Sequence, residues 1–347
     1  APLVDRVNSR QELDDLLAQM IAEFGLLHSQ IRVADQRTDS ETAPVARLGA
    51  VFSSTDAGLK IERIYRGEAE TPSDRGPLER AAIKILEGDV LTRVNGQPVR
   101  TDGDLNQALR EQSGQQVLIE LMRDGKPLKT VVTPVAQGRD SQLRYNDWVI
   151  RTRETVNKAS QGRIGYVHLF AMGATDVASF AREFYANYDR EGLIIDVRRN
   201  RGGNIDSWII EKLLRRNWMT WKTAKGVTYN NMQQTFGGQL VVLTDEMTYS
   251  DGETFANGVK TLKLAPLIGT QTAGAGVWLS DRNRLMDGGM ARIGETGQYN
   301  AAGELLVEGV GVTPDIVVEN KPYATATGQD AQLEAALSHL LQRLPKR

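Results

Sequence analysis

Apolar residues near the start of the chain recur every three or four positions. They are Leu13, Leu16, Leu17, Met20, Ile21 and Phe24. This spacing predicts a helix of about four turns, with Ser9 as its N-cap and Gly25 at its end. The helix leads directly into His28, and a polar connector follows from residue 29 to 43.

From residue 45 to 135 the pattern changes to short apolar runs between tight-turn signals. The predicted strands are 48–52, 60–64, 90–94, 117–122 and 129–135. One helix is predicted at 102–112, and Asn95-Gly96 and Asp124-Gly125 are typical of tight turns. Short strands around one helix indicate a small β-rich binding domain.

Beyond residue 137 strands and helices alternate. Strands are predicted at 164–168, 192–197, 239–243 and 265–269, and helices at 148–158, 175–188, 206–216, 250–262 and 331–344. This alternation indicates an α/β core. We therefore expect three parts: an N-terminal helical part (1–44), a β-rich domain (45–136) and an α/β domain (137–347).

Composition excludes several kinds of chemistry. The 42 basic and 44 acidic residues give a net charge of −2, so bulk charge attracts neither nucleic acid nor an anionic membrane. There are no cysteines, which excludes disulfides, thiolate catalysis and Cys-ligated zinc. Only three histidines are present, so we predict no metal and no cofactor. No apolar stretch is long enough to span a bilayer.

A glycine-rich turn at 196–204 follows a predicted strand and precedes a predicted helix. Gly202 and Gly203 permit unusual backbone angles and expose amide N–H groups. Such amides bind phosphate or stabilise an oxyanion, but a tight turn also requires glycine by itself. The turn alone leaves both interpretations open.

Ser250 lies at the start of a predicted helix. It is either a simple N-cap, with Glu253 completing a capping box, or a nucleophile that gains from the helix dipole. Among the histidines, His168 is expected on a strand and His339 on the amphipathic C-terminal helix. By elimination, His28 is the best candidate for a catalytic base.

Five segments, in this order along the chain, resemble the catalytic core of the tricorn protease family. They are 165–168, 195–203, 209–213, 249–252 and 307–315. That family is related to the C-terminal processing peptidases. The resemblance implies a multidomain α/β (α+β) protein whose α/β domain is a serine peptidase core of the C-terminal processing peptidase and crotonase-like type.

The resemblance implies a serine endopeptidase that forms an acyl-enzyme. By resemblance, Ser250 is the nucleophile, His28 the base and Glu308 the acid that orients the base. The oxyanion would be bound by the backbone amides of Gly203 and Asp251.

The middle domain resembles a PDZ domain, on residues 47–52 and 87–99. By this resemblance Leu48, Gly49, Ala50 and Val51 bind an extended peptide, and their loop holds its terminal carboxylate.

The chain departs from the family pattern at two places. Leu27 stands where the family has a Ser beside the base, which reduces or rearranges its four-residue relay. Around Trp218 and Trp221 the acid that selects basic side chains is absent. We therefore expect Trp218 and Trp221 to line an apolar substrate pocket; the alternative is that they pack in the core or a subunit interface.

Peptides are the predicted partners, and the resemblance implies a homo-oligomer, a hexamer in this family. The family's N-terminal propellers have no counterpart here, so we expect the catalytic part of a larger protein. The resemblance favours the cytoplasm, with the periplasm as the other compartment. Two other functions stay open: an inactive peptide-binding protein, favoured by Leu27, and a phosphate-binding protein, disfavoured because no P-loop motif is present.

Overall fold

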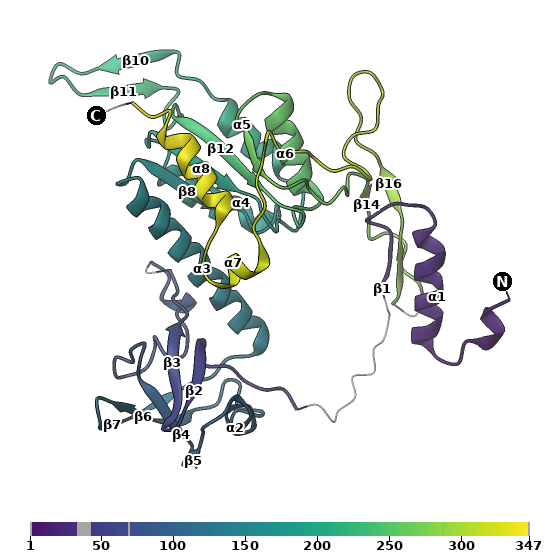
Figure 1. The fold of residues 1–347 in the computed structure, drawn as a ribbon. Coiled ribbons are helices and arrows are strands. Elements are labelled where there is room, and N and C mark those ends of the chain that lie inside the picture. Colours follow the sequence, from purple (N-terminus) through teal and green to yellow (C-terminus); the bar gives the residue numbers. More distant parts are fainter. Residues whose placement is uncertain (1, 33–42, 69, 287, 346–347) are drawn as a thin grey trace. The chain divides into compact units, whose positions relative to one another are not determined.

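The computed structural model describes residues 2–32, 43–68, 70–286 and 288–345. The chain divides into two compact units (Figure 1). Unit 1 contains residues 1–37 and 155–347, and unit 2 contains residues 38–154. The division falls within one long helix, α3 (Gln137–Ala159).

Unit 1 is built on a five-stranded parallel sheet with the strand order β17-β13-β12-β9-β8. Its strands are β8 (Ile164–His168), β9 (Gly192–Asp196), β12 (Gln239–Thr244), β13 (Leu267–Gly269) and β17 (Ile316–Val317). The central strands are continuous apolar runs and are buried, as expected of a parallel sheet covered on both faces. The covering helices are α4 (Ala174–Tyr185), α5 (Asp206–Leu214), α6 (Asp251–Thr261) and α8 (Ala331–Leu341).

The order of the central strands places two of the predicted site segments at the same edge of the sheet. β9 and β12 are parallel neighbours, with Asp196 paired to Leu243 near their carboxyl ends. The glycine-rich turn follows β9, and the segment that contains Ser250 follows β12. Because both loops leave the same edge of the sheet, this edge is the expected position for a site in an α/β fold.

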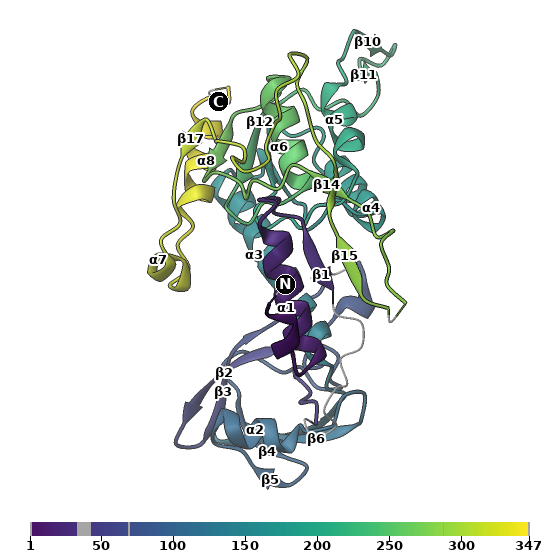
Figure 2. The ribbon, with the colours of Figure 1, turned by 90° about the vertical axis from the view of Figure 1, so that its right-hand side faces the viewer.

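Unit 1 also contains an N-terminal helix and the two small antiparallel sheets formed by β1, β14, β15 and β16 (Figure 2). In α1 (Arg10–Ala22) the Ser9 hydroxyl accepts the Glu12 N–H at 3.2 Å, as the sequence predicts. The strand β1 (Gln30–Arg32) pairs with β15 (Met290–Arg292), and β14 (Trp278–Leu279) pairs with β16 (Gly294–Thr296). These pairings fix the chain that follows His28 against residues far away in sequence.

Unit 2 is an antiparallel sheet with the helix α2 (Asp102–Ala108) and the first part of α3. The strand order is β2-β3-β4-β6-β7, with β5 (Gln97–Pro98) paired to β4. The strands are β2 (Ala50–Thr55), β3 (Gly58–Ile64), β4 (Val90–Val94), β6 (Val117–Arg123) and β7 (Lys126–Val132). Asp124 and Gly125 both have positive φ in the β6–β7 hairpin, as the turn signal predicts.

The mixed α/β architecture predicted from the sequence is confirmed, and the elements that differ are short or exposed. The helix expected at 148–158 is the second half of α3, which begins at Gln137. The sequence did not predict the hairpin of β10 (Met219–Lys222) and β11 (Thr228–Asn231), the small strands β1, β14–β17, the helix α7 (Pro322–Ala326), or the short 3-10 helices at Val4–Arg6 and Pro72–Asp74. Two- to four-residue strands carry too little periodicity to be recognised, because their pairing partners decide them.

Candidate active site

Ser250 lies on a sharp turn between β12 and α6. Its φ of 58° and ψ of −122° are unusual for a residue with a side chain. The Ser250 side chain makes no capping hydrogen bond, whereas its backbone N–H donates to Glu253 Oε2 at 3.0 Å. The helix start is therefore secured by Glu253, and the serine hydroxyl is not needed as a simple N-cap.

The glycine-rich turn packs directly against Ser250. Gly202 has a φ of 77°, and a Cβ on it would collide with Cβ and Oγ of Ser250. Gly203 has a φ of 154°, and a Cβ there would collide with the Met172 carbonyl. Both positions therefore require glycine, and the turn lies in contact with the serine side chain.

Two backbone amides beside this contact are unpaired. Within the part of the chain that the structure describes, the N–H groups of Gly203 and Asp251 donate no hydrogen bond. The N–H of Gly202, by contrast, donates to Asn200 Oδ1 at 2.8 Å. Gly203 and Asp251 are thus the amides of these two segments that remain available to an incoming oxygen.

The Asp251 carboxylate ties the serine helix to the glycine-rich turn. Asp251 Oδ2 accepts the N–H groups of Ile205 at 2.7 Å and Asp206 at 3.2 Å, at the start of α5. Burial, followed by the charge of Asp206, raises the pKa of Asp251 to about 7. The sequence interpretation used only the amide of Asp251 and missed its carboxylate.

His28 follows α1 and is 7% exposed. Its ring packs against Tyr249, the residue before Ser250, with 4.6 Å between ring centroids. Burial lowers the pKa of His28, while the Glu308 charge and a backbone hydrogen bond at Val277 oppose this shift. His28 is therefore favoured in its neutral form, which is the form a general base needs.

Glu308 binds the chain beside His28 rather than the ring itself. Its Oε1 accepts the Leu27 N–H at 3.1 Å, and its Oε2 accepts the Val277 N–H at 2.6 Å. Among the described residues no hydrogen bond joins Glu308 to His28. The Leu27 side chain is 53% exposed, so its backbone, and not its side chain, makes the contact with the acid.

The structure thus brings five of the predicted site residues to one edge of the sheet. Ser250 contacts the turn that contains Gly203 and precedes Asp251, while Tyr249 joins Ser250 to His28 and Leu27 joins His28 to Glu308. The other histidines lie elsewhere. Nε2 of His168 is 3.0 Å from the Arg198 carbonyl, and His339 lies on α8.

Trp218 and Trp221 are exposed on the β10–β11 hairpin. Their exposed fractions are 71% and 49%, and Trp221 stacks on Tyr229 with 6.4 Å between ring centroids. This exposure rules out packing in the core. The hairpin pairs with no other strand of the described ranges. A pocket lined by Trp218 and Trp221 stays a prediction.

The predicted peptide-binding loop of unit 2 carries a carboxylate of its own. The Gly49 N–H donates to Asp140 Oδ1 at 3.1 Å, and Leu48 is buried. A peptide carboxylate would therefore compete with Asp140 for this amide, and its binding by this loop stays a prediction. Ala50 and Val51 begin β2, which lies at the edge of its sheet and leaves one side open for strand addition.

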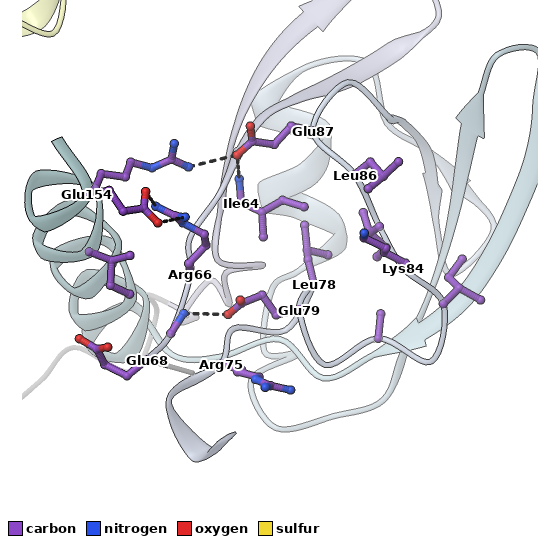
Figure 3. A pocket seen from close by; sticks show the side chains of 16 residues that line it. Ile64, Arg66, Glu68, Arg75, Leu78, Glu79, Lys84, Leu86, Glu87 and Glu154 are labelled. Carbon is purple, nitrogen blue, oxygen red and sulfur yellow. Dashed lines mark hydrogen bonds and ion pairs between the residues drawn. The ribbon is translucent and has the colours of Figure 1, made fainter. Parts of the chain in front are cut away.

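Unit 2 also contains a cavity of about 1060 Å³ between the chain from Ile64 to Glu87 and α3 (Figure 3). Four of its charged side chains form two pairs: Arg66 binds Glu154 through two hydrogen bonds of 2.9 and 3.0 Å, and Arg151 binds Glu87 at 3.1 Å. These pairs secure the wall of the cavity and give no specific reason to assign it a ligand.

Metal and membrane features are absent from the described ranges. No group of three or more potential ligands from His, Asp and Glu is close enough to hold a metal ion there. No described helix is long and apolar enough to cross a bilayer.

Comparison with known proteins gives the class first. Residues 163–318 match peptidase family S41, and residues 46–137 match the tricorn protease PDZ domain. The chain therefore carries an S41 peptidase domain with a tricorn-type PDZ domain, and the resemblance noted in the sequence is confirmed.

The particular relatives are tricorn proteases. The chain is 33% identical to a tricorn protease homolog of Saccharolobus solfataricus and 28% identical to the tricorn protease of Thermoplasma volcanium, in each case over 99% of its length. The crystal structure of the tricorn protease superposes with a TM-score of 0.91 at 26% identity, covering 99% of this chain and 33% of that chain. The chain spans 30% to 40% of the length of the first curated relatives.

Proposed function

We propose that the chain is a serine endopeptidase that cleaves peptides through an acyl-enzyme. The observation that carries this proposal is the packing of Gly202 on Ser250, with the unpaired amides of Gly203 and Asp251 on either side of that contact. A nucleophile, its base and two oxyanion donors are the minimum set for acyl transfer.

In this mechanism His28 removes the proton from Ser250 as the serine oxygen attacks the peptide carbonyl. The amides of Gly203 and Asp251 bind the negative oxygen of the tetrahedral intermediate. One such donor contributes about 2.7–4 kcal/mol of transition-state stabilisation. His28 then protonates the leaving amine, and water hydrolyses the acyl-enzyme by the same steps.

Glu308 supports the base through the backbone and through charge. By accepting the Leu27 N–H it fixes the chain that carries His28, and its charge stabilises the histidinium that forms during attack. These two interactions take over part of the role that the family's Ser beside the base has in the four-residue relay. Peptides are proposed to reach the site as extended segments, with β2 of unit 2 as an additional binding edge.

A fluorophosphonate probe tests the proposal directly. Wild-type protein should label at one serine and hydrolyse peptides, and Ser250→Ala should abolish both while thermal unfolding stays nearly unchanged. His28→Ala should be almost as damaging, because base and nucleophile act as a unit. Full activity of Ser250→Ala, or loss of activity in a folded His168→Ala but not in His28→Ala, contradicts the assignment.

A catalytically inactive peptide-binding protein is the second candidate. It is favoured by the lack of a hydrogen bond between Glu308 and His28 among the described residues. In that case the wild-type chain binds extended peptides but reacts with no fluorophosphonate.

A further inference from the structure

The first turn of α6 carries a buried carboxylate that the mechanism above does not use. Glu253 is 0% exposed. Its Oε1 accepts hydrogen bonds from Thr272 Oγ1 and the Gly274 N–H, both at 2.6 Å. Its Oε2 accepts the N–H groups of Ala275 at 2.8 Å and Ser250 at 3.0 Å. Donors from two separate segments therefore converge on one side chain.

The segment that Glu253 binds, residues 272–277, in turn holds Glu308. Four hydrogen bonds join it to residues 308–312: Val312 N–H to Thr272 Oγ1 at 2.7 Å, Thr272 N–H to the Val312 carbonyl at 3.2 Å, Gly309 N–H to the Gly274 carbonyl at 2.8 Å, and Val277 N–H to Glu308 Oε2 at 2.6 Å. A Cβ on Gly276 would lie 2.7 Å from the Glu308 backbone nitrogen, so the two segments are in close contact.

We propose that Glu253 is a positioning residue that couples the nucleophile to the acid. It fixes the backbone of Ser250 and, through residues 272–277, the place of Glu308 beside the base. This inference rests on the proposed function. It goes further because it assigns to Glu253 a role in the geometry of the site rather than only in capping α6.

The chemistry of the four donors requires a carboxylate. Each donor points an N–H or O–H at an oxygen, and an ionised carboxylate is acceptor-only. A glutamine would turn one of its two acceptors into an NH₂ group that opposes these donors. The positive end of the α6 dipole adds to the stabilisation of the negative charge.

A merely structural role and a positioning role predict different pH profiles. The charged groups that act on His28 are Glu308 and Arg292, and the Tyr249 ring packs on it. Because Glu253 is not among these charges, its replacement can change His28 only by moving residues 272–277. That segment holds Glu308 and contains Val277, whose backbone hydrogen bond also raises the pKa of His28. A purely structural residue would leave the titration of His28 unchanged.

The test is the pH dependence of fluorophosphonate inactivation in the full chain. Glu253→Gln should slow inactivation on the order of 10²-fold. It should also move the acid limb to lower pH, in the same direction as Glu308→Gln, because the acid no longer supports the charged base. In the double variant the two shifts should add only in part, since both remove the support that Glu308 gives to His28.

Asp89→Asn is the matched control. Asp89 is also a buried carboxylate that accepts a backbone N–H, from Leu86, but it lies in unit 2. It should lower thermal stability without changing the acid limb. If Glu253→Gln does not fold, Thr272→Val removes one donor and should produce a smaller shift in the same direction.

An unchanged acid limb in Glu253→Gln, or in Thr272→Val where it is used, overturns the inference. A shift that adds in full to the shift of Glu308→Gln also overturns it. These outcomes are distinguishable from failure of the proposed function. That function fails if wild type does not react or Ser250→Ala still does.

Discussion

At the scale of single residues, burial decides how the ionisable groups of the site behave. His28 and Asp251 are both removed from water, and burial disfavours the charged form of each: the pKa of the histidine is lowered and that of the aspartate is raised. Near neutral pH His28 is therefore favoured in the neutral form that can accept a proton, while Asp251 is close to its own titration point.

The first prediction concerns the acid limb of activity. The kcat/KM of peptide hydrolysis should fall only below pH 6.5, the ordinary pKa of histidine, because the pKa of His28 is lowered. Glu308→Gln should move this limb to still lower pH, since it removes a negative charge that raises the His28 pKa. Profiles for the two proteins check this, and a limb that moves upward contradicts it.

The second prediction concerns stability at Asp251. Its pKa is about 7 in the folded chain and 3.8 as a free group, so between these values the folded state holds a proton that the unfolded state has released. This contribution to stability is complete below pH 3.8 and is lost as the pH rises through 7. Asp251→Asn should remove this pH-dependent loss of stability. The melting temperature of the variant minus that of wild type should therefore be higher at pH 8 than at pH 5.

Replacing Asp206 provides the control for this pH effect. Its charge is the second cause of the raised Asp251 pKa, so Asp206→Asn should lower that pKa and weaken the dependence. If the difference in melting temperature between wild type and Asp251→Asn is the same at both pH values, the raised pKa of Asp251 is contradicted.

At the scale of elements, the site depends on close contacts that only certain turns permit. The turn after β9 and the start of α6 touch through Gly202 and Ser250, which leaves no space for a side chain on the turn. The edge strand β2, by contrast, has one side open to another strand. The loop before it is already hydrogen-bonded, because the Gly49 N–H donates to Asp140.

The third prediction is that Gly202→Ala inactivates the enzyme. A Cβ there collides with Ser250, so kcat/KM should fall on the order of 10²-fold, as for loss of an oxyanion donor. Gly303→Ala is the matched control: Gly303 has a φ of 81° against 77°, and a Cβ on it meets nothing within 4 Å. In both variants the left-handed backbone conformation should lower the free energy of unfolding by about 1–2 kcal/mol. Only Gly202→Ala should also lose activity. Equal activity of the two variants would contradict the contact between Gly202 and Ser250.

The fourth prediction concerns unit 2. In the Ser250→Ala background, labelled peptides with free and with amidated C-termini should bind equally, because Asp140 occupies the Gly49 amide. Adding Asp140→Ala should give the free carboxylate an advantage, which fluorescence anisotropy can measure. A clear preference for free C-termini while Asp140 is still present would show that the Gly49 amide is available to a peptide carboxylate.

At the scale of the whole molecule, the predicted pocket residues Trp218 and Trp221 are exposed. We propose a preference for apolar side chains on the acyl side of the scissile bond, to be tested with fluorogenic peptides carrying Leu, Phe, Lys or Asp. Trp218→Ala and Trp221→Ala should weaken that preference, and Trp208→Ala, an exposed tryptophan on α5, should not. The highest kcat/KM for Lys would contradict it. The predicted hexamer is a separate question that light scattering answers.

The sequence by itself determined the long elements and the identity of the chemical groups. The helix after Ser9, the strands β9 and β12, and the turn signals at Asn95-Gly96 and Asp124-Gly125 carry strong local patterns, so they were predictable. Ser250, His28 and Glu308 were proposed from the order of the motifs and the family resemblance. Local periodicity and motif order do not reveal which distant segments meet.

Tertiary structure decided the contacts among those groups. Three contacts illustrate this: the Leu27 backbone binds Glu308, Asp140 accepts the Gly49 N–H, and Glu253 joins Ser250 to residues 272–275. They involve partners 19 to 281 positions apart or a choice between competing acceptors. Such partners are selected by packing and by the need to satisfy buried polar groups, and neither is encoded in a local pattern. The two exposed tryptophans show the same limit, because an apolar residue in the sequence does not say whether the fold will bury it.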